Sequence, residues 1–145
     1  MEPIRVKKLN PKAQLPTYGS EQAAGADLYA CLDADVTVEP GKTQFIPTGL
    51  AMEIPRGCAG LIYARSSMGA KRGLAPANKV GVIDSDYRGQ IMVALHNHGT
   101  ETQTVTCGER IAQLVITPVF TPGFIEVDEL TDTQRASGGF GSTGK

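Results

Sequence analysis

The segment Val36-Thr-Val-Glu-Pro-Gly-Lys-Thr-Gln-Phe-Ile46 decides the fold of this chain. Two short stretches with β-branched or aromatic residues flank the four-residue signal Glu-Pro-Gly-Lys. Residues of these types are enriched in strands, whereas neighbouring proline and glycine favour a turn. The segment therefore predicts two short strands, at Val36–Val38 and Thr43–Ile46, joined by a tight turn.

The same alternation of strand-like stretches and turns runs along most of the chain. With 17 glycines and 9 prolines, few segments are long enough for a helix. One helical turn is expected from Arg65-Ser-Ser-Met68. The pattern predicts an all-β subunit, a sandwich or jelly roll rather than an α/β nucleotide-binding fold. The remaining expected strands are Ile4–Leu9, Asp27–Cys31, Ala51–Ile54, Gly60–Ala64, Gly81–Ile83, Gln90–Leu95, Thr102–Val105, Ile111–Phe120 and Phe124–Val127.

Length, charge and cysteine content narrow the class of protein. A chain of 145 residues fits one domain, and a net charge of -1 provides no field to attract a polyanion. A nucleic-acid partner is therefore disfavoured, and the absence of a long apolar run disfavours a membrane protein. The three cysteines (31, 58 and 107) form no paired motif. They predict free thiols in a reducing cytoplasm, with two or three of them buried.

The last residues differ in composition from the rest. We expect a β domain over residues 1–133 and a mobile glycine-rich segment over residues 134–145. Composition alone favours a terminus without a role as much as a functional one. Two features favour function: Phe140 stands among glycines, and Arg135, Ser142 and Thr143 offer hydrogen-bond donors to an anion.

Two short segments carry polar groups in unusual places. Asp27 lies inside the apolar stretch Ala24–Ala30, where a turn or surface position is the favoured interpretation and an acceptor for metal-bound water is the alternative. Arg65-Ser66-Ser67 combines a guanidinium with two hydroxyls. By itself this triplet is more typical of a helix cap than of a polyphosphate site.

The segment Gly81-Val-Ile-Asp-Ser-Asp-Tyr-Arg-Gly89 is the most informative. Its acids either cap the backbone of a β-hairpin or include one, Asp84, that holds a water for attack, with the ring of Tyr87 beside a sugar. Gln113 adds a neutral donor to a strand that is otherwise apolar. His96 and His98 lack a third metal ligand, so we interpret them as surface or edge residues.

Five segments together resemble the trimeric dUTPase family in order and spacing. They are Ala-Gly-Ala-Asp-Leu at 24–28, Arg-Ser-Ser at 65–67, the hairpin at 81–89, Gly-Glu-Arg-Ile-Ala-Gln at 108–113 and Arg-Ala-Ser-Gly-Gly-Phe-Gly-Ser-Thr-Gly at 135–144. The resemblance covers nearly the whole chain. It implies a jelly-roll subunit, a homotrimer whose active sites are each shared between three chains, and Mg²⁺-assisted hydrolysis of dUTP to dUMP and pyrophosphate.

The resemblance also implies a role for individual residues. Asp84 would orient and deprotonate the attacking water, and Asp27 would contact Mg²⁺ through water. The uracil edge would be read by Asn78 and by the backbone of Gly81, Val82 and Ile83. Met92 would either close that pocket or belong to the core, and Tyr87 would stack on the deoxyribose. The phosphates would be held by Arg65, Ser66, Ser67 and Gln113, with a lid formed by Arg135, Phe140, Gly141, Ser142 and Thr143.

Two departures from the family pattern keep alternatives open. Many members have proline where this chain has Ala64, and Arg-Ser-Gly where it has Arg65-Ser66-Ser67. The related dCTP deaminases often show Arg-Ser-Ser, but they need a glutamate on the strand after the hairpin, where Ala94 stands here. A nucleotide-sensing regulatory protein is the other alternative. Both are disfavoured, because Ala94 cannot transfer a proton and the complete set of motifs argues for turnover.

Overall fold

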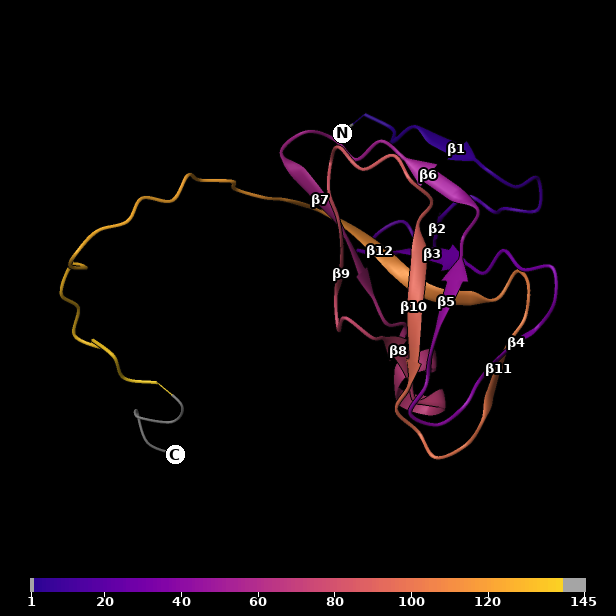
Figure 1. The fold of residues 1–145 in the computed structure, drawn as a ribbon. Helices are drawn as coiled ribbons and strands as arrows, with labels where there is room; N and C mark the ends of the chain where they lie inside the picture. Colours follow the sequence, from indigo (N-terminus) through magenta and orange to yellow (C-terminus); the bar gives the residue numbers. More distant parts are fainter. Residues whose placement is uncertain (1, 140–145) are drawn as a thin grey trace.

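A computed structural model describes residues 2–139 of the chain. They form short strands and one π-helical turn, and every strand pairing is antiparallel (Figure 1). The elements are β1 (Val6–Lys8), β2 (Thr17–Tyr18), β3 (Ala26–Tyr29), β4 (Val36–Val38), β5 (Thr43–Pro47), β6 (Leu50–Met52), β7 (Cys58–Tyr63), η1 (Ser67–Lys71), β8 (Leu74–Pro76), β9 (Gly81–Ile83), β10 (Met92–Asn97), β11 (Gln103–Val105) and β12 (Arg110–Pro118).

Four small sheets enclose one hydrophobic core. The order is β2-β3-β12-β7-β9 in the five-stranded sheet and β5-β10-β8 in the three-stranded sheet, with β1-β6 and β11-β4 as two-stranded ribbons. Side chains from both larger sheets meet in the core, such as Leu28 and Ile111 from one and Ile46 and Leu95 from the other. Each buried side chain of this size contributes about 2 kcal/mol. The expected jelly-roll-like β subunit is confirmed.

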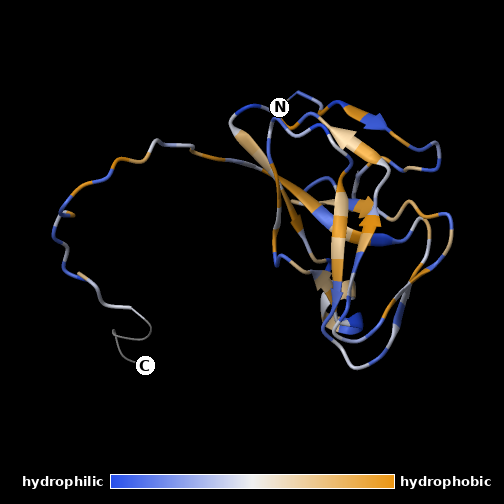
Figure 2. Ribbon diagram, viewed as in Figure 1, coloured by the Kyte–Doolittle hydropathy of each residue, from blue (hydrophilic) through white to orange (hydrophobic). Residues whose placement is uncertain are grey.

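Side-chain burial alternates along β10, the central strand of the three-stranded sheet. This alternation explains why the strand could be predicted from the sequence. In β10, Val93, Leu95 and Asn97 are buried, whereas Met92 is exposed and the residues between are half-buried. This is the alternation expected when one face of a strand covers a core. Figure 2 shows the same apolar bias on the strands of the body.

One expected strand was wrong and two strands were missed. Phe124–Val127 forms no strand, since this segment lies beyond the body and has no strand beside it, and Phe124 is 96% exposed. The strands β2 and β8 were missed because two or three residues are too few to show a period. The expected helical turn is a π-turn that begins at Ser67.

Fewer cysteines are buried than expected, and the two histidines lie in different surroundings. Only Cys31 is buried, whereas Cys58 is half-buried and Cys107 is exposed in the turn before β12. His98 is exposed, as predicted. His96, in contrast, lies on β10, which has a partner strand on both sides and is no edge. Within residues 2–139, no helix has the length and apolar character needed to cross a membrane.

After β12 the chain leaves the body as an extended arm, here residues 119–139 (Figure 1). Its large apolar side chains are almost fully exposed: Phe120 98%, Phe124 96%, Ile125 87% and Leu130 88%. The expected boundary at residue 133 stays a prediction. Among residues 2–139, these apolar side chains of the arm have no packing partner.

Candidate active site

A polar hollow of about 400 Å³ lies where β3, β12 and the start of η1 meet. It brings together four of the predicted phosphate-binding residues, Arg65, Ser66, Ser67 and Gln113, with the predicted metal-contacting residue Asp27. The other lining residues are Gly19, Ala23, Gly25 and Arg110. Segments 24–28, 65–67 and 108–113, far apart in sequence, therefore form one site.

Asp27 is the organising residue of this hollow, which is called the phosphate hollow below after its predicted ligand. Its side chain is only 12% exposed, and each carboxylate oxygen accepts a hydrogen bond from a different arginine. Arg65 Nε donates to Oδ1 at 2.7 Å, and Arg110 Nη1 donates to Oδ2 at 3.3 Å. The favoured interpretation of Asp27 as a turn or surface acid was wrong. A carboxylate at this depth needs charged partners, and here it holds two guanidinium groups at the hollow.

The Arg65-Ser66-Ser67 triplet is not a side-chain helix cap. Ser66 precedes η1 with helical backbone angles and makes no side-chain capping hydrogen bond. Ser67 Oγ instead accepts a hydrogen bond from Arg65 Nη1 at 3.2 Å. Both serines are exposed and line the hollow. The capping interpretation was therefore wrong.

Gln113 reaches the hollow because of a glycine on the adjacent strand. Its amide Nε2 donates to the carbonyl of Ala64 at 2.9 Å. A Cβ atom on Gly25 would lie 2.5 Å from Gln113 Oε1, closer than packed atoms allow. The glycine of the Ala24-Gly25-Ala26 segment is thus required by the close approach of this side chain.

Sequence reasoning missed Arg110 as a site residue. In a regular strand, residues 110 and 113 point to opposite faces. Here the pairing of β12 with β3 shifts between Arg110 and Ala112, so that β12 has one extra residue. This bulge brings Arg110 to the same face as Gln113, and Ile111 and Ala112 are both buried. An arginine three residues before Gln113 was the only available signal.

A second, smaller hollow of about 180 Å³ lies at the connection between β9 and β10. This connection is not the predicted β-hairpin, because β9 pairs with β7 whereas β10 pairs with β5 and β8 in another sheet. We keep the name hairpin hollow for it. It is lined by Val82, Ile83, Asp84, Tyr87, Gln90 and Met92. Tyr87 Oη donates to the carbonyl of Gln90 at 2.9 Å, and the Tyr87 amide donates to the carbonyl of Asp84 at 3.2 Å. The ring of Tyr87 crosses the turn so closely that Gly89 has no room for a side chain. The loop after β9 thus holds the aromatic ring in the same hollow as the Asp84 side chain.

Other predicted residues surround this hairpin hollow. Met92 is 37% exposed and belongs to its lining, so the alternative of a core role was wrong. Asn78 is exposed, and its amide lies beside Gly81, where an added Cβ would be 3.3 Å from Nδ2. Asp84 is exposed. Within residues 2–139, neither Asp84 nor Asp86 caps a backbone amide with its side chain, contrary to the simple hairpin interpretation.

The two hollows do not adjoin within one chain. They share no lining residue. Asp27 is on β3 and Asp84 follows β9, which is three strands away in the sheet, or roughly 14 Å. Along the strands, Asp27 is level with Tyr63, whereas Ile83 is level with Gly60, which adds about 10 Å. The structure therefore does not bring Asp84 together with Arg65 in the same subunit.

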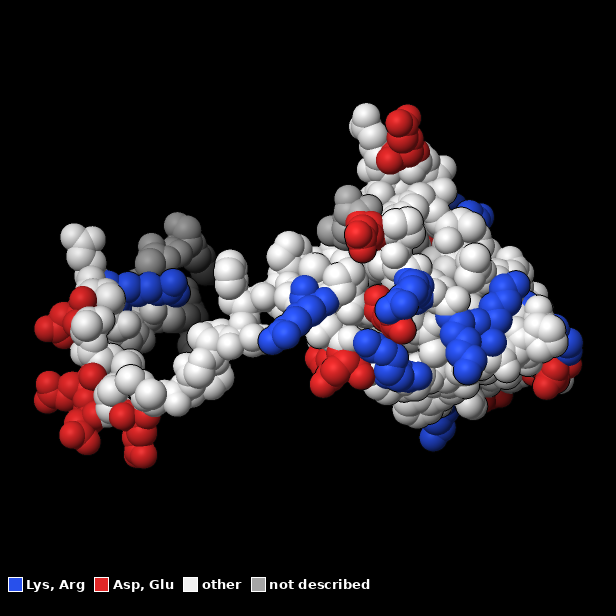
Figure 3. Space-filling view, turned by 90° about the horizontal axis from the view of Figure 1, so that it is seen from above, with Lys and Arg blue, Asp and Glu red and all other residues white. Residues whose placement is uncertain are grey.

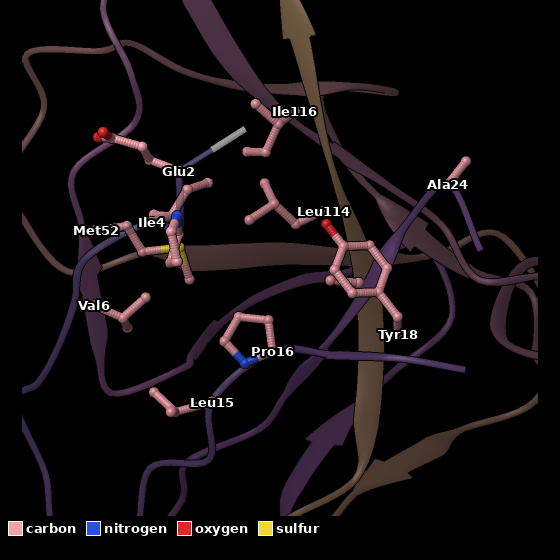
Figure 4. Close-up of a pocket in the computed structure, with 12 residues that line it drawn as sticks. Glu2, Ile4, Val6, Leu15, Pro16, Tyr18, Ala24, Met52, Leu114 and Ile116 are labelled. Carbon is pink, nitrogen blue, oxygen red and sulfur yellow. The ribbon is translucent and has the colours of Figure 1, made fainter. Parts of the chain in front are cut away.

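A third cavity contains none of the predicted residues. It has a volume of about 490 Å³ and lies between the N-terminal segment, β6 and β12 (Figure 4). Its lining is mostly apolar and includes Ile4, Val6, Met52, Leu114 and Ile116. The polar residues of the first two hollows are thus separate from this apolar cavity, which is the largest of the three.

The remaining predicted residues lie on or beyond the arm. Arg135 is exposed, and its Nε donates to the carbonyl of Gly138 at 2.8 Å. Figure 1 shows this part of the arm well away from the body. Phe140, Gly141, Ser142 and Thr143 lie outside the described residues.

The chain resembles known proteins over its full length. A sequence model of the dUTPase family matches residues 11–144. A deoxyuridine 5'-triphosphate nucleotidohydrolase from Janthinobacterium sp. (strain Marseille) is 50% identical over 148 residues, covering 100% of this chain and 99% of the relative. The enzyme of the same name from Paraburkholderia phymatum is 52% identical and covers 98% of each chain.

Solved structures give the same relationship. The dUTPase of Staphylococcus bacteriophage 80alpha with dUPNHPP superimposes with a TM-score of 0.89 at 29% identity, covering 100% of each chain. The dUTPase from phage phi11 of S. aureus has a TM-score of 0.81 at 26% identity, covering 91% of this chain and 100% of the other. By sequence and by fold, this chain belongs to the dUTPase family.

Proposed function

We propose that this protein hydrolyses dUTP to dUMP and pyrophosphate. The observation that carries the proposal is the phosphate hollow, in which one buried carboxylate, Asp27, holds Arg65 and Arg110 beside two exposed serines, Ser66 and Ser67. Guanidinium groups are well suited to phosphate oxygens. The relatives at about 50% identity bear the name of this activity.

The hairpin hollow is suited to the nucleoside and to the attacking water. Asn78 and the backbone of Gly81–Ile83 would pair with the uracil edge, and Met92 would close the pocket. Tyr87 would stack on the deoxyribose, where a 2′-hydroxyl would clash. A site whose buried polar groups match one base rejects another strongly, because the wrong base leaves those groups unpaired.

Asp84 would act as the general base. It would accept a proton from a water whose oxygen forms a bond to phosphorus, while the bond between the α- and β-phosphates breaks and pyrophosphate leaves. The exposed position of Asp84 in the hairpin hollow leaves room for such a water. General-base catalysis of this kind contributes roughly 10²–10⁴-fold to a rate.

A complete site needs more than one chain, and we propose a homotrimer in which each active site is shared between three chains. The separation of the two hollows in one subunit supports this assembly, since one dUTP must contact both. So does the arm, which exposes Phe120, Phe124 and Leu130 and carries several acids, while Lys and Arg are spread over the face of the body in Figure 3. The apolar cavity beside β1 and β6 would suit such an arm from another copy.

Mg²⁺ fits this site as an ion held mainly by the substrate. Among residues 2–139, no group of three His, Cys, Asp or Glu side chains could cage a metal. Mg²⁺ commonly binds through one or two carboxylates together with substrate phosphates and keeps several waters. Asp27 retains lone pairs beyond its two arginine bonds, so it could accept a hydrogen bond from a metal-bound water. The ion would neutralise charge on the departing pyrophosphate.

The glycine-rich terminus would act as a lid. Phe140 would cover the uracil, with Arg135, Gly141, Ser142 and Thr143 near the terminal phosphate. Closure of such a segment excludes bulk water while the attacking water is retained. The support for this role is the match of the family model, which extends to residue 144.

Deamination of dCTP is the weaker alternative. Ala94 lies on β10 opposite Phe45 of β5, and its methyl group can neither donate nor accept a proton.

We propose a pyrophosphate-release assay with dUTP, dTTP, dCTP and UTP, with and without Mg²⁺. The proposal predicts release from dUTP alone, strengthened by Mg²⁺. Ammonia from dCTP, or no preference among the four nucleotides, would overturn it.

A further inference from the structure

All three nitrogens of the Arg72 guanidinium donate hydrogen bonds, and Arg72 lies outside the lining of the phosphate hollow. It directly follows η1, and its guanidinium is only 28% exposed. Nε donates to Gln103 Oε1 at 2.9 Å, Nη2 donates to the carbonyl of Thr104 at 2.6 Å, and Nη1 donates to Glu109 Oε1. One side chain therefore connects the end of η1 with β11 and with the turn before β12.

Glu109 is also held by two hydrogen bonds of its own, besides the one from Arg72. Its second carboxylate oxygen accepts a hydrogen bond from the amide of Thr106 at 3.1 Å, and its carbonyl accepts one from the amide of Ala30 at 2.8 Å. The next residue, Arg110, already points to the hollow and pairs with Asp27. Glu109 thus belongs to the same rigid turn that presents Arg110.

η1 depends on such contacts for its position. A π-turn of five residues is a rare element, and this one lacks a side-chain cap at its start. At its front, Arg65 is held by Asp27 inside the hollow. At its back, Arg72 is held by Glu109 outside it. Neither Arg72 nor Glu109 lines the hollow, so neither is placed to touch a ligand there.

We infer that Arg72 and Glu109 form a positioning pair for phosphate binding: their ion pair holds η1, and with it Ser66 and Ser67, at the correct distance from Arg110 and Gln113. The inference rests on the proposed function, because the outer phosphates of dUTP are the ligand concerned. A shift of about 1 Å in a binding group can lower a rate about 100-fold. The pair therefore affects phosphate affinity only by setting the position of η1, without touching the ligand.

A purely structural role makes a different prediction from a positioning role. If the pair only stabilised the fold, its loss would lower the melting temperature and leave the preference among nucleotides unchanged. If it positions η1, its loss weakens binding of the β- and γ-phosphates and spares the nucleoside. The affinities of dUpNHpp, which keeps the triphosphate, and of dUMP, which lacks its outer phosphates, separate the two roles.

The experiment compares Arg72→Lys, Arg72→Met and Glu109→Gln with the native protein by calorimetry with dUpNHpp and dUMP. Lysine keeps the charge but not the three-way donor geometry. We expect about tenfold weaker dUpNHpp binding in Arg72→Met and Glu109→Gln, less loss in Arg72→Lys, and dUMP affinity within about twofold of native. The double variant Arg72→Met/Glu109→Gln should be little worse than Arg72→Met alone, because Arg72→Met already removes the ion pair with Glu109 together with the bonds to Gln103 and Thr104.

A matched control is Lys12→Met, which breaks the exposed Lys12–Asp33 ion pair at 2.7 Å outside both hollows. It should leave both affinities unchanged. Equal loss for the two nucleotides, or unchanged dUpNHpp binding in Glu109→Gln and Arg72→Lys, would overturn the inference. These two conservative variants keep the fold if Arg72→Met does not. Failure of the native protein to bind dUpNHpp would instead overturn the proposed function.

Discussion

Asp27 and Arg65 are joined by a 2.7 Å hydrogen bond between Oδ1 and Nε, and both side chains are largely shielded from solvent, at 12% and 22% exposed. This contact ties β3 of the five-stranded sheet to the start of η1. It makes one acidic residue responsible for the direction of the arginine that we propose binds phosphate. The Asp27 carboxylate and the Arg65 guanidinium are therefore a single functional unit.

Replacing Asp27 by asparagine should disturb both stability and substrate binding. The amide keeps the shape but leaves Arg65 and Arg110 without their shared counter-charge. We expect the free energy of unfolding in urea to fall by about 2 kcal/mol and dUTP turnover to fall with it. The control Glu53→Gln breaks the exposed pair with Arg5 and should cost at most about 1 kcal/mol. Equal effects of the two changes would show that Asp27 has no special role.

Asp84→Asn should separate binding from chemistry. An amide can hold a water but cannot accept its proton, so dUTP affinity should stay near native while kcat falls by about 100-fold or more. Asp86→Asn is a matched control, since Asp86 is exposed and does not line the hairpin hollow. Native turnover in Asp84→Asn would remove this residue from the mechanism.

Gly25→Ala should displace Gln113 from the phosphate hollow. The added Cβ would lie 2.5 Å from Gln113 Oε1, so the amide must move away from Ala64. We expect weaker dUTP binding and a loss of about 1–3 kcal/mol in unfolding free energy. In Gly25→Ala/Gln113→Ala the contact with Oε1 is removed and only the contact with the Cβ of residue 113 at 3.1 Å remains, so most of the stability should return while binding remains weak. A double variant as unstable as Gly25→Ala would place the strain elsewhere.

Cutting the chain before Arg135 should give a folded protein with little activity. The residues from 119 to the cut form no strand or helix, and the core is complete at β12. Circular dichroism should therefore be unchanged, while pyrophosphate release from dUTP falls sharply because the lid is missing. Unfolding of the shortened chain would show instead that the terminus is structural.

His98 should make stability depend on pH. Partial loss of hydration at this exposed ring, and then the Lys79 ammonium and the His96 ring, lower the pKa of His98 below its ordinary value of about 6.5. The folded state therefore favours the neutral ring, so the unfolded state binds more protons. This contribution is complete above about pH 6.5 and is lost as the pH falls through the lowered pKa.

Titration by NMR and unfolding in urea at pH 5 and pH 7 measure this effect. Lys79→Met should raise the pKa of His98, because Lys79 Nζ lies 3.4 Å from His98 Nε2. His98→Gln should reduce the difference in stability between the two pH values. An unchanged difference in His98→Gln would assign the pH dependence to other groups.

Much of this molecule is determined locally by its residues. Short runs of β-branched and aromatic residues form strands wherever prolines and glycines end them, as at Val36–Val38 and Thr43–Pro47, because these preferences act over a few residues. The segments around Asp27, Arg65, Asp84 and Gln113 were also recognisable in the sequence. Their order and spacing identified the family without any coordinates.

Only the tertiary structure decided how those segments meet. The burial of Asp27 between two arginines, the bulge that turns Arg110 toward Gln113 and the π-turn held by Arg72 all depend on contacts between residues far apart in the chain. So does the separation of Asp84 from the phosphate hollow, which follows from the order of strands in the sheet. Local sequence patterns carry no record of sheet order or depth, because both are set by which strands pair and what the shared core can accommodate.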